Sequence, residues 1–199
     1  MGKKEKKKKK MVMMIKSRKI STAVGLCIIA LLLVLSAVFL YLSSLTATNL
    51  ILNALLLIVS MTLVFFSTHP LAHYIVAGIY GVRVEHFFIA PSDFRKLNQR
   101  GAKFFGSKVP TLGTKLDRGT LSGISSEKRA RIYGAGVIAS SILILVPLVY
   151  SAIVGRGSPI AILLGILFFA GNLAFELEFS TKVGDLSKMK REYIRSRSC

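Results

Sequence analysis

Four long apolar runs constrain the fold of this chain more than any other feature. Each exceeds the roughly 18 residues that distinguish a membrane span from a buried core helix, and 52% of the 199 residues are hydrophobic. A segment in lipid must satisfy its own backbone polar groups, and a helix does so internally. The sequence therefore predicts an all-α fold, a multi-pass bundle of about four transmembrane helices at residues 21–44, 50–82, 132–154 and 158–179.

The 28 Lys and Arg residues predict how these spans are oriented. Ten fall in residues 1–20 and eleven in residues 83–131, whereas residues 45–49 hold none and residues 155–157 hold one. If four spans alternate in direction, 27 of the 28 positive charges lie on one side, which the positive-inside rule identifies as the cytoplasm. We therefore expect an integral membrane protein with both termini and the 83–131 loop in the cytoplasm.

The same pattern divides the chain into segments. Residues 1–20 are expected to form a basic cytoplasmic tail. Residues 21–44 are expected to be an anchor span, because this run is too long and too poorly flanked for a cleaved signal peptide. Residues 45–189 then form a membrane domain that includes the cytoplasmic loop 83–131, and residues 190–199 form a basic C-terminal tail.

The lysine run from Lys3 to Lys10 is a candidate contact for the membrane surface. A polybasic segment beside a span is attracted to anionic lipid headgroups by about 1 kcal/mol per residue. A nucleic-acid interface would combine such charges with aromatic residues or a folded basic module, and neither accompanies this run. We therefore expect the lipid bilayer and its anionic headgroups as partners, and we do not expect nucleic acid.

Two histidines near the end of the second run are candidate metal ligands. His69 and His73 are four residues apart, so on a continuous helix both imidazoles project from one face and can bind one ion. The same spacing occurs in the H-E-x-x-H signature of zinc hydrolases, whose glutamate is the general base. Here Pro70 occupies that position, and proline can neither bind a metal nor accept a proton. A cysteine-based zinc site is excluded within one chain, because Cys27 and Cys199 each lack a neighbouring cysteine.

Pro70 leaves two backbone arrangements open. Proline disfavours the helical conformation of the preceding residue, and its ring clashes with the carbonyl four residues earlier, that of Phe66. Either the helix continues with a kink, or it ends near Thr68 and restarts with Pro70 in its first turn. In the second arrangement His69 is a cap residue, and the two histidines need not face the same way.

The region around the histidines resembles the metal-binding span of site-2-type intramembrane zinc proteases. Residues 58–88 read IVSMTLVFFSTHPLAHYIVAGIYGVRVEHFF, an apolar run followed by the histidine pair, small residues and a Gly-Val turn. Near the fourth span, GNLAFELEFSTKVGDLSKM offers Asn172 and Asp185 where that family has an asparagine and its third zinc ligand. Where the family has an Ala-Gly-Pro element, this chain has Gly134-Ala135-Gly136-Val137.

This resemblance implies a zinc site made of His69, His73 and Asp185 in a degenerate member of the family. The chain departs from the family pattern at Gly184 as well, which precedes Asp185 instead of following it. Topology supports the grouping without any family knowledge. At about 1.5 Å per residue, His69 lies roughly 28 Å below Leu50, near the cytoplasmic boundary that Asp185 also reaches after the fourth span.

The 83–131 segment is the only sizeable extramembrane part of the chain. It mixes basic residues with phenylalanines and turn signals, which favours short amphipathic or extended pieces on the membrane surface. In the resembled family the corresponding interval holds strands and membrane-associated elements that present substrate. In this chain the segment is equally suited to dock a partner.

We therefore expect a site-2-protease-like membrane protein that lacks peptidase activity and binds a membrane partner or substrate, with zinc as its candidate cofactor. Two alternatives stay open. One is an active intramembrane zinc protease with another general base, for which the nearby candidates are Glu176, Glu178, Glu85 and His86. The other is a membrane scaffold or transport subunit that binds no metal. Interfacial charges or salt bridges are the simpler interpretation of each candidate base.

Overall fold

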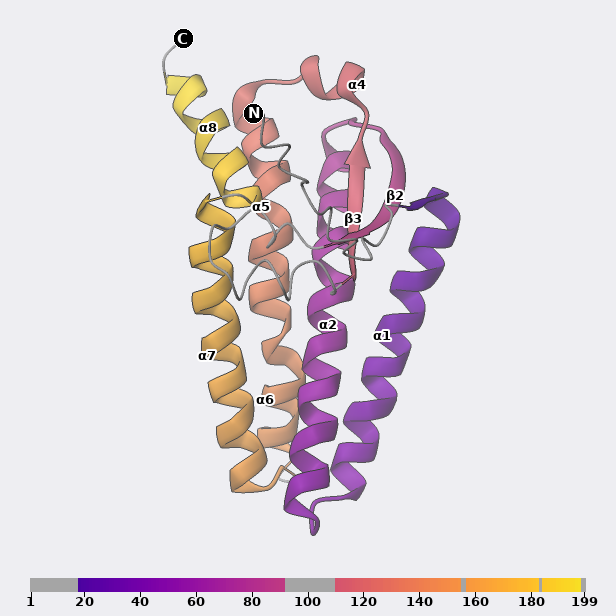
Figure 1. Cartoon of the computed structure of the whole chain (residues 1–199), viewed down its shortest axis with the longest axis vertical. Helices are drawn as coiled ribbons and strands as arrows, with labels where there is room; N and C mark the ends of the chain where they lie inside the picture. Colours follow the sequence, from indigo (N-terminus) through magenta and orange to yellow (C-terminus); the bar gives the residue numbers. More distant parts are fainter. Residues whose placement is uncertain (1–17, 92–109, 155–156, 183, 198–199) are drawn as a thin grey trace, which may run out of the picture.

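A computed structural model of the chain describes residues 18–91, 110–154, 157–182 and 184–197. Four helical spans stand side by side, each long and apolar enough to cross a membrane (Figure 1). They are formed by α1 (Thr22–Leu45), α2 (Leu50–Ile79), α5 with α6 (Ser126–Ile153) and α7 (Pro159–Lys182). The predicted all-α multi-pass bundle is confirmed. The lysine run, Cys199 and residues 92–109 of the predicted loop lie outside the described residues.

Three predicted boundaries were wrong by several residues. The fourth span ends at Lys182 instead of residue 179. The second span ends at Ile79 instead of Val82, and the chain turns at Gly81, whose φ of 69° favours glycine. The third span begins at Ser126, six residues before the predicted Ile132. Hydropathy did not reveal this start, because the first turns of the helix are charged. Ser125 caps the helix by accepting a hydrogen bond from the backbone N–H of Lys128.

The third span is interrupted in its second half. It consists of α5 (Ser126–Leu143) and α6 (Leu145–Ile153), which meet at Ile144. Pro147 lies four residues after Leu143. Proline has no N–H to donate to the Leu143 carbonyl, and its ring lies too close to that oxygen in a regular helix. Pro147 therefore accounts for the position of the break.

By contrast, α2 runs through Pro70 without a break. Two hydroxyls before the proline bond back to carbonyls of the preceding turn, Ser67 to Leu63 at 2.8 Å and Thr68 to Val64 at 2.7 Å. These bonds go to the carbonyls of Leu63 and Val64, whereas the carbonyl that Pro70 leaves without its N–H is that of Phe66. The continuous helix is therefore an observation that these two hydroxyls do not explain. The arrangement in which the helix restarts at Pro70 was therefore wrong, and both histidines belong to one continuous helix.

The core of the bundle surrounds α2, which packs against α1, α5, α6 and α7. Apolar side chains on the outer surface are exposed, for example Ile51 at 75% and Ile153 at 78%. Such exposed side chains suit a lipid environment, because lipid tails are as apolar as the side chains of isoleucine and leucine. The main buried cluster consists of Ala54, Leu57, Met61, Ile144, Leu148 and Ala161.

A buried asparagine joins three segments at the end of the bundle away from the sheet. The Asn53 amide donates to the Ser43 carbonyl at 2.7 Å, and its oxygen accepts from the backbone N–H and the hydroxyl of Ser158 at 3.0 and 3.1 Å. Asn53 is fully buried. It therefore ties the α1–α2 turn to the start of α7.

We expect Asn53→Ala to destabilise the fold by about 1–3 kcal/mol, because it leaves buried polar groups of Ser43 and Ser158 without their partner. Thermal unfolding followed by circular dichroism in neutral detergent would measure the shift. Ser44→Ala removes an exposed hydroxyl at the same end and is the matched control. An unchanged unfolding midpoint for Asn53→Ala would contradict this role.

A small sheet lies at the other end of the bundle, where the predicted loop begins. Its order is β1-β2-β3, antiparallel, with β1 (Arg18–Ile20), β2 (Val84–Pro91) and β3 (Pro110–Leu116). The segments α4 (Arg118–Ser122) and α8 (Asp185–Arg197) complete this end of the molecule (Figure 1).

Two contacts attach the sheet to the helices. The fully buried Phe87 ring lies against Gly25 of α1, where a Cβ atom would overlap it, and 6.0 Å from the ring of Tyr74 in α2. The Thr114 hydroxyl of β3 donates to the carbonyl of Pro70 at 3.2 Å. The sheet is therefore fixed to α2 beside the two histidines.

Candidate metal centre

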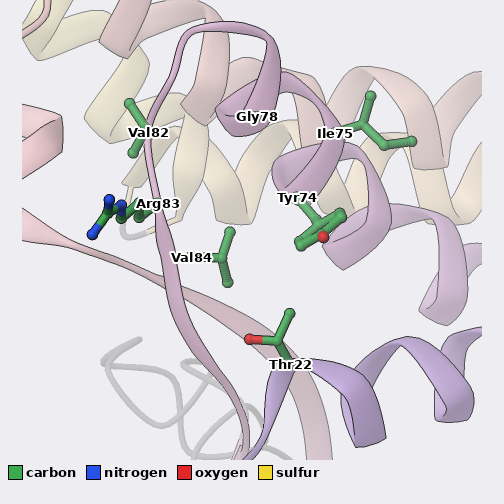
Figure 2. A pocket seen from close by; sticks show the side chains of 7 residues that line it. All are labelled: Thr22, Tyr74, Ile75, Gly78, Val82, Arg83 and Val84. Atoms are coloured by element: carbon green, nitrogen blue, oxygen red, sulfur yellow. The ribbon is translucent and has the colours of Figure 1, made fainter.

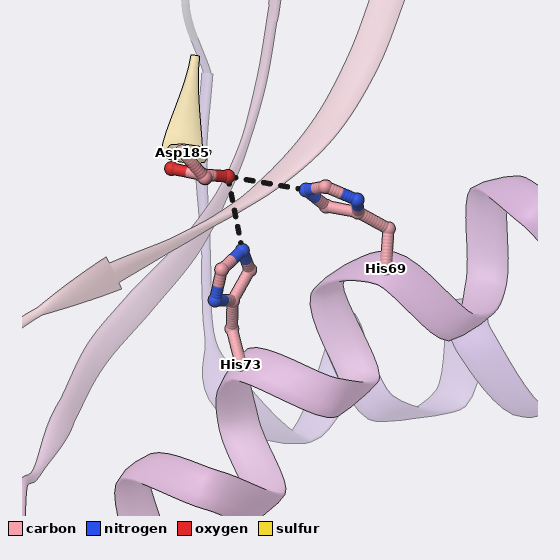
Figure 3. Close-up of side chains that lie close together, drawn as sticks. All are labelled: His69, His73 and Asp185. Carbon is pink, nitrogen blue, oxygen red and sulfur yellow. Dashed lines mark hydrogen bonds and ion pairs between the residues drawn. The ribbon is translucent and has the colours of Figure 1, made fainter. Parts of the chain in front are cut away.

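Three side chains from two helices converge at the sheet end of the bundle. The Nε2 atoms of His69 and His73 lie 3.2 and 3.1 Å from the same atom, Asp185 Oδ2 (Figure 3). All three candidate ligand atoms lie within 4.8 Å of one another. In a tetrahedral zinc site with bonds of about 2.0–2.1 Å, neighbouring ligand atoms are about 3.3 Å apart. The three predicted ligand atoms therefore lie close enough together to hold one metal ion.

Hydrogen bonds behind the histidines orient their rings. His73 Nδ1 lies 2.8 Å from the carbonyl oxygen of Ile132, and His69 Nδ1 lies 3.4 Å from the hydroxyl of Ser140. A carbonyl only accepts, so His73 Nδ1 carries the proton. His73 Nε2 then donates a hydrogen bond to Asp185 when it is protonated as well, and it offers a lone pair to a metal ion when it is not. A proton or a cation between these atoms makes the approach favourable. This is the arrangement in which metal-binding histidines are usually held.

Gly136 of α5 lies close against the imidazoles of both histidines. A Cβ atom at this position would overlap His73 Nε2 and would lie 2.9 Å from His69 Nε2. The residues present therefore form a cradle that a single methyl group would fill. The sequence showed Gly136 as one of several small residues near the start of a span, but it did not show which helix this glycine faces.

The turn between α7 and α8 places Asp185. A Cβ atom at Gly184 would lie 2.7 Å from the Cα atom of Ser180, so only glycine fits this close approach. The Ser180 hydroxyl accepts a hydrogen bond from the backbone N–H of Leu186 at 3.0 Å, which holds the start of α8. The close approach to Ser180 thus explains why this chain has a glycine directly before Asp185.

The Asp185 side chain is an anion at neutral pH. Its burial raises the pKa of the carboxyl, but hydrogen bonds from His69 and His73 outweigh burial and hold the pKa well below its usual range. The ammonium of Lys188 adds a positive charge 2.8 Å from Oδ1. A carboxylate in this state is ready to bind a cation.

Of the four candidate replacement bases, the structure brings one near the centre. Glu178 is exposed and pairs with Lys182 at 2.7 Å, which confirms the salt-bridge interpretation for this residue, and Glu85 lies 3.5 Å from His86 in β2. Glu176 is buried in α7, with 9% of its surface exposed, and interacts electrostatically with His69 and Asp185. Its burial was not visible in the sequence.

A cavity of about 390 Å³ lies on another face of α2 (Figure 2). Tyr74, Ile75 and Gly78 of α2 line it together with residues of α1, β2 and the turn before β2. None of the three candidate ligands is among its lining residues. The cavity is therefore separate from the metal centre, although Tyr74 follows His73 directly. Its remaining lining residues are Thr22, Val82, Arg83 and Val84.

Comparison with protein-family models gives no match, and comparisons with curated proteins and with solved structures give none either. The resemblance to site-2-type proteases therefore stays a prediction from the motifs of this chain. The geometry of the three side chains is the independent observation on which a function can be argued.

Proposed function

We propose that this chain is a site-2-protease-like membrane protein that binds zinc through His69, His73 and Asp185 and holds a membrane partner or substrate there without cleaving it. The observation that carries the proposal is the convergence of these three ligands beside Gly136, where a side chain would overlap the two Nε2 atoms. Two imidazoles and a carboxylate are a common zinc ligand set. Pro70 supplies no proton acceptor where the zinc hydrolases have one.

The exposure of the centre supports a role in binding. His69 and Asp185 keep 23% and 19% of their side-chain surface exposed. A zinc ion with three protein ligands has an open fourth position, which supplies Lewis-acid chemistry in hydrolases. A carbonyl or carboxylate of a partner can occupy that position in this chain. Without a base to activate water, such a contact leads to capture instead of hydrolysis.

Zinc content of the full chain in detergent tests this proposal. We expect about one zinc per chain in the wild type and none in the His69→Ala/His73→Ala variant, because a single remaining carboxylate does not hold the ion. His86→Ala removes a histidine outside the centre and is expected to keep the zinc. A metal-free wash removes loosely held ions before analysis. A wild type without zinc would contradict the proposal.

We also propose that the sheet end of the bundle faces the cytoplasm, as the distribution of Lys and Arg predicts. With Cys27 replaced by serine, a membrane-impermeant maleimide applied to sealed cells should label Cys199 only after the membrane is opened. Labelling of intact cells would place the C-terminus outside and contradict this orientation.

One observation favours a second candidate function, zinc-dependent hydrolysis with Glu176 as general base. Glu176 is buried and lies close enough to interact with His69 and Asp185, and buried acids within membrane spans are commonly functional. In addition, the amide nitrogen of Asn172, one helical turn away, is buried and has no hydrogen-bond partner among the described residues. Unpartnered buried polar atoms are places where water enters.

This second function makes a separate prediction. If the wild type hydrolyses a quenched single-span reporter peptide in proteoliposomes, Glu176→Gln should lower the rate by about 10²–10⁴-fold and leave the zinc content unchanged. Glu178→Gln, on the exposed side of the same helix, is the control. A wild type without turnover, or equal loss in both variants, would reject Glu176 as the base.

A further inference from the structure

A second cavity, of about 240 Å³, lies where α8 packs against α5. Tyr133 of α5 lines it, together with residues of α8 that carry three positive charges and one negative charge. The α8 residues are Lys188, Arg191, Glu192 and Arg195.

The negative charge in this pocket is already engaged. Glu192 Oε2 accepts a hydrogen bond from Arg129 Nε at 2.8 Å, and the two side chains are only 14% and 18% exposed. Arg195 lies farther from Glu192, at 3.4 Å, and is 71% exposed. Because Arg129 neutralises Glu192 from the α5 side, the pocket presents a net positive charge to an incoming molecule.

The pocket is placed at the level expected for lipid headgroups. Tyr133 follows the charged first turns of α5 and precedes the apolar part of this span, and tyrosines are enriched at that boundary. On α8, the side chains of Tyr193 and Ile194 are 49% and 57% exposed beside five Lys and Arg residues. The helix α8 rises beyond the end of α7 beside the first turns of α5, so its first turn, which carries Lys188, is the part nearest to the membrane boundary (Figure 1).

We propose that this pocket binds the phosphate of an anionic phospholipid headgroup. Arg191 and Arg195 can donate paired N–H groups to phosphate oxygens, and Lys188 adds an ammonium. The Lys188 ammonium is held 5.5 Å from the centre of the Tyr133 ring, so one cation is already positioned in the pocket. A headgroup and free phosphate offer the same phosphate oxygens to this pocket. The position of Tyr133, between the charged and the apolar parts of α5, favours the lipid.

Lys188 also links this pocket to the zinc centre, a step that rests on the proposed function. The same ammonium that lines the pocket lies 2.8 Å from Asp185 Oδ1. A phosphate in the pocket shares this positive charge, so more of the carboxylate's charge is available to a metal ion. Binding at the two sites should therefore be mutually favourable, because linkage makes the effect reciprocal.

Titration calorimetry of the full chain in neutral detergent tests the lipid site. We expect dioctanoyl phosphatidylglycerol to bind and dioctanoyl phosphatidylcholine not to bind. An arginine near an anionic headgroup contributes about fivefold in affinity, so Arg191→Gln/Arg195→Gln should weaken the binding about thirtyfold. Lys190→Gln/Arg197→Gln removes the same charge from α8 outside the pocket and is the control. The lysine-rich N-terminal segment is present in every variant, so its attraction for the lipid cancels.

Three results would overturn the lipid site. They are equal weakening in both double variants, binding of phosphatidylcholine as tight as that of phosphatidylglycerol, and tighter binding of inorganic phosphate than of the lipid. The last result would assign the pocket to a soluble phosphate compound.

The link to the metal is tested by repeating the phosphatidylglycerol titration with zinc-loaded and zinc-stripped protein. We expect about fivefold tighter lipid binding with zinc, within the usual range for coupled sites. Equal affinity would reject the link while the lipid site stands. A wild type that holds no zinc would instead count against the metal centre alone.

Discussion

Gly136→Ala is expected to lower the affinity for zinc by about 10–100-fold while the protein stays folded. The added methyl group would overlap His73 Nε2 and crowd His69 Nε2, so both ligand atoms would have to move. Alanine is a better helix former than glycine by about 1 kcal/mol, so α5 itself is not weakened. Zinc content and thermal unfolding, measured on the same preparation, separate loss of the site from loss of the fold.

Gly78→Ala is the matched control for this experiment. Gly78 lies in α2, the helix of both histidines, and a Cβ atom there would have no neighbour within 4 Å. This variant should therefore keep its zinc. If Gly136→Ala binds zinc as tightly as the wild type, the ion is not held in the space between α2 and α5, and the proposed ligand set is wrong.

The sequence was sufficient to predict the elements that depend on local pattern. Helical periodicity places His69 and His73 on one face, and hydropathy identifies the four spans. Asp185 was found only through a resemblance of motifs and a matching depth. The structure brings it to both histidines, at a point 112 residues along the chain from His73.

The other features of the centre depend on contacts between distant segments and could not be predicted. Which way Gly136 faces is decided by how α5 packs against α2, and the Ile132 carbonyl receives His73 Nδ1 for the same reason. Pro70 was ambiguous because proline chemistry permits a break or a continuous helix. The break in the third span was missed, although Pro147 is a local signal for it.

The sheet connects the histidine helix to the chain segment that was expected to dock a partner. Thr114 bonds to the Pro70 carbonyl, so β3 is fixed one residue from His69. The sheet and the part of α2 that carries both imidazoles are therefore in direct contact.

Pro70→Glu is expected to give the protein the activity of a zinc-dependent hydrolase. The substitution supplies a carboxylate at the position that the general base occupies in the H-E-x-x-H signature, next to His69. A positioned general base contributes about 10²–10⁴-fold to the rate. Cleavage of a quenched single-span reporter in proteoliposomes, with and without a chelator, measures the gain.

Pro70→Ala separates the backbone effect from the chemistry. It restores the N–H that proline lacks and should stabilise α2 without supplying a base, so no cleavage is expected. Cleavage by Pro70→Ala would show that helix geometry limits the wild type and that a base is already present. Because Glu176 is the buried acid that interacts with His69 and Asp185, it would then be that base. Cleavage by Pro70→Glu alone would show that the three ligands form a complete zinc site that lacks only its base.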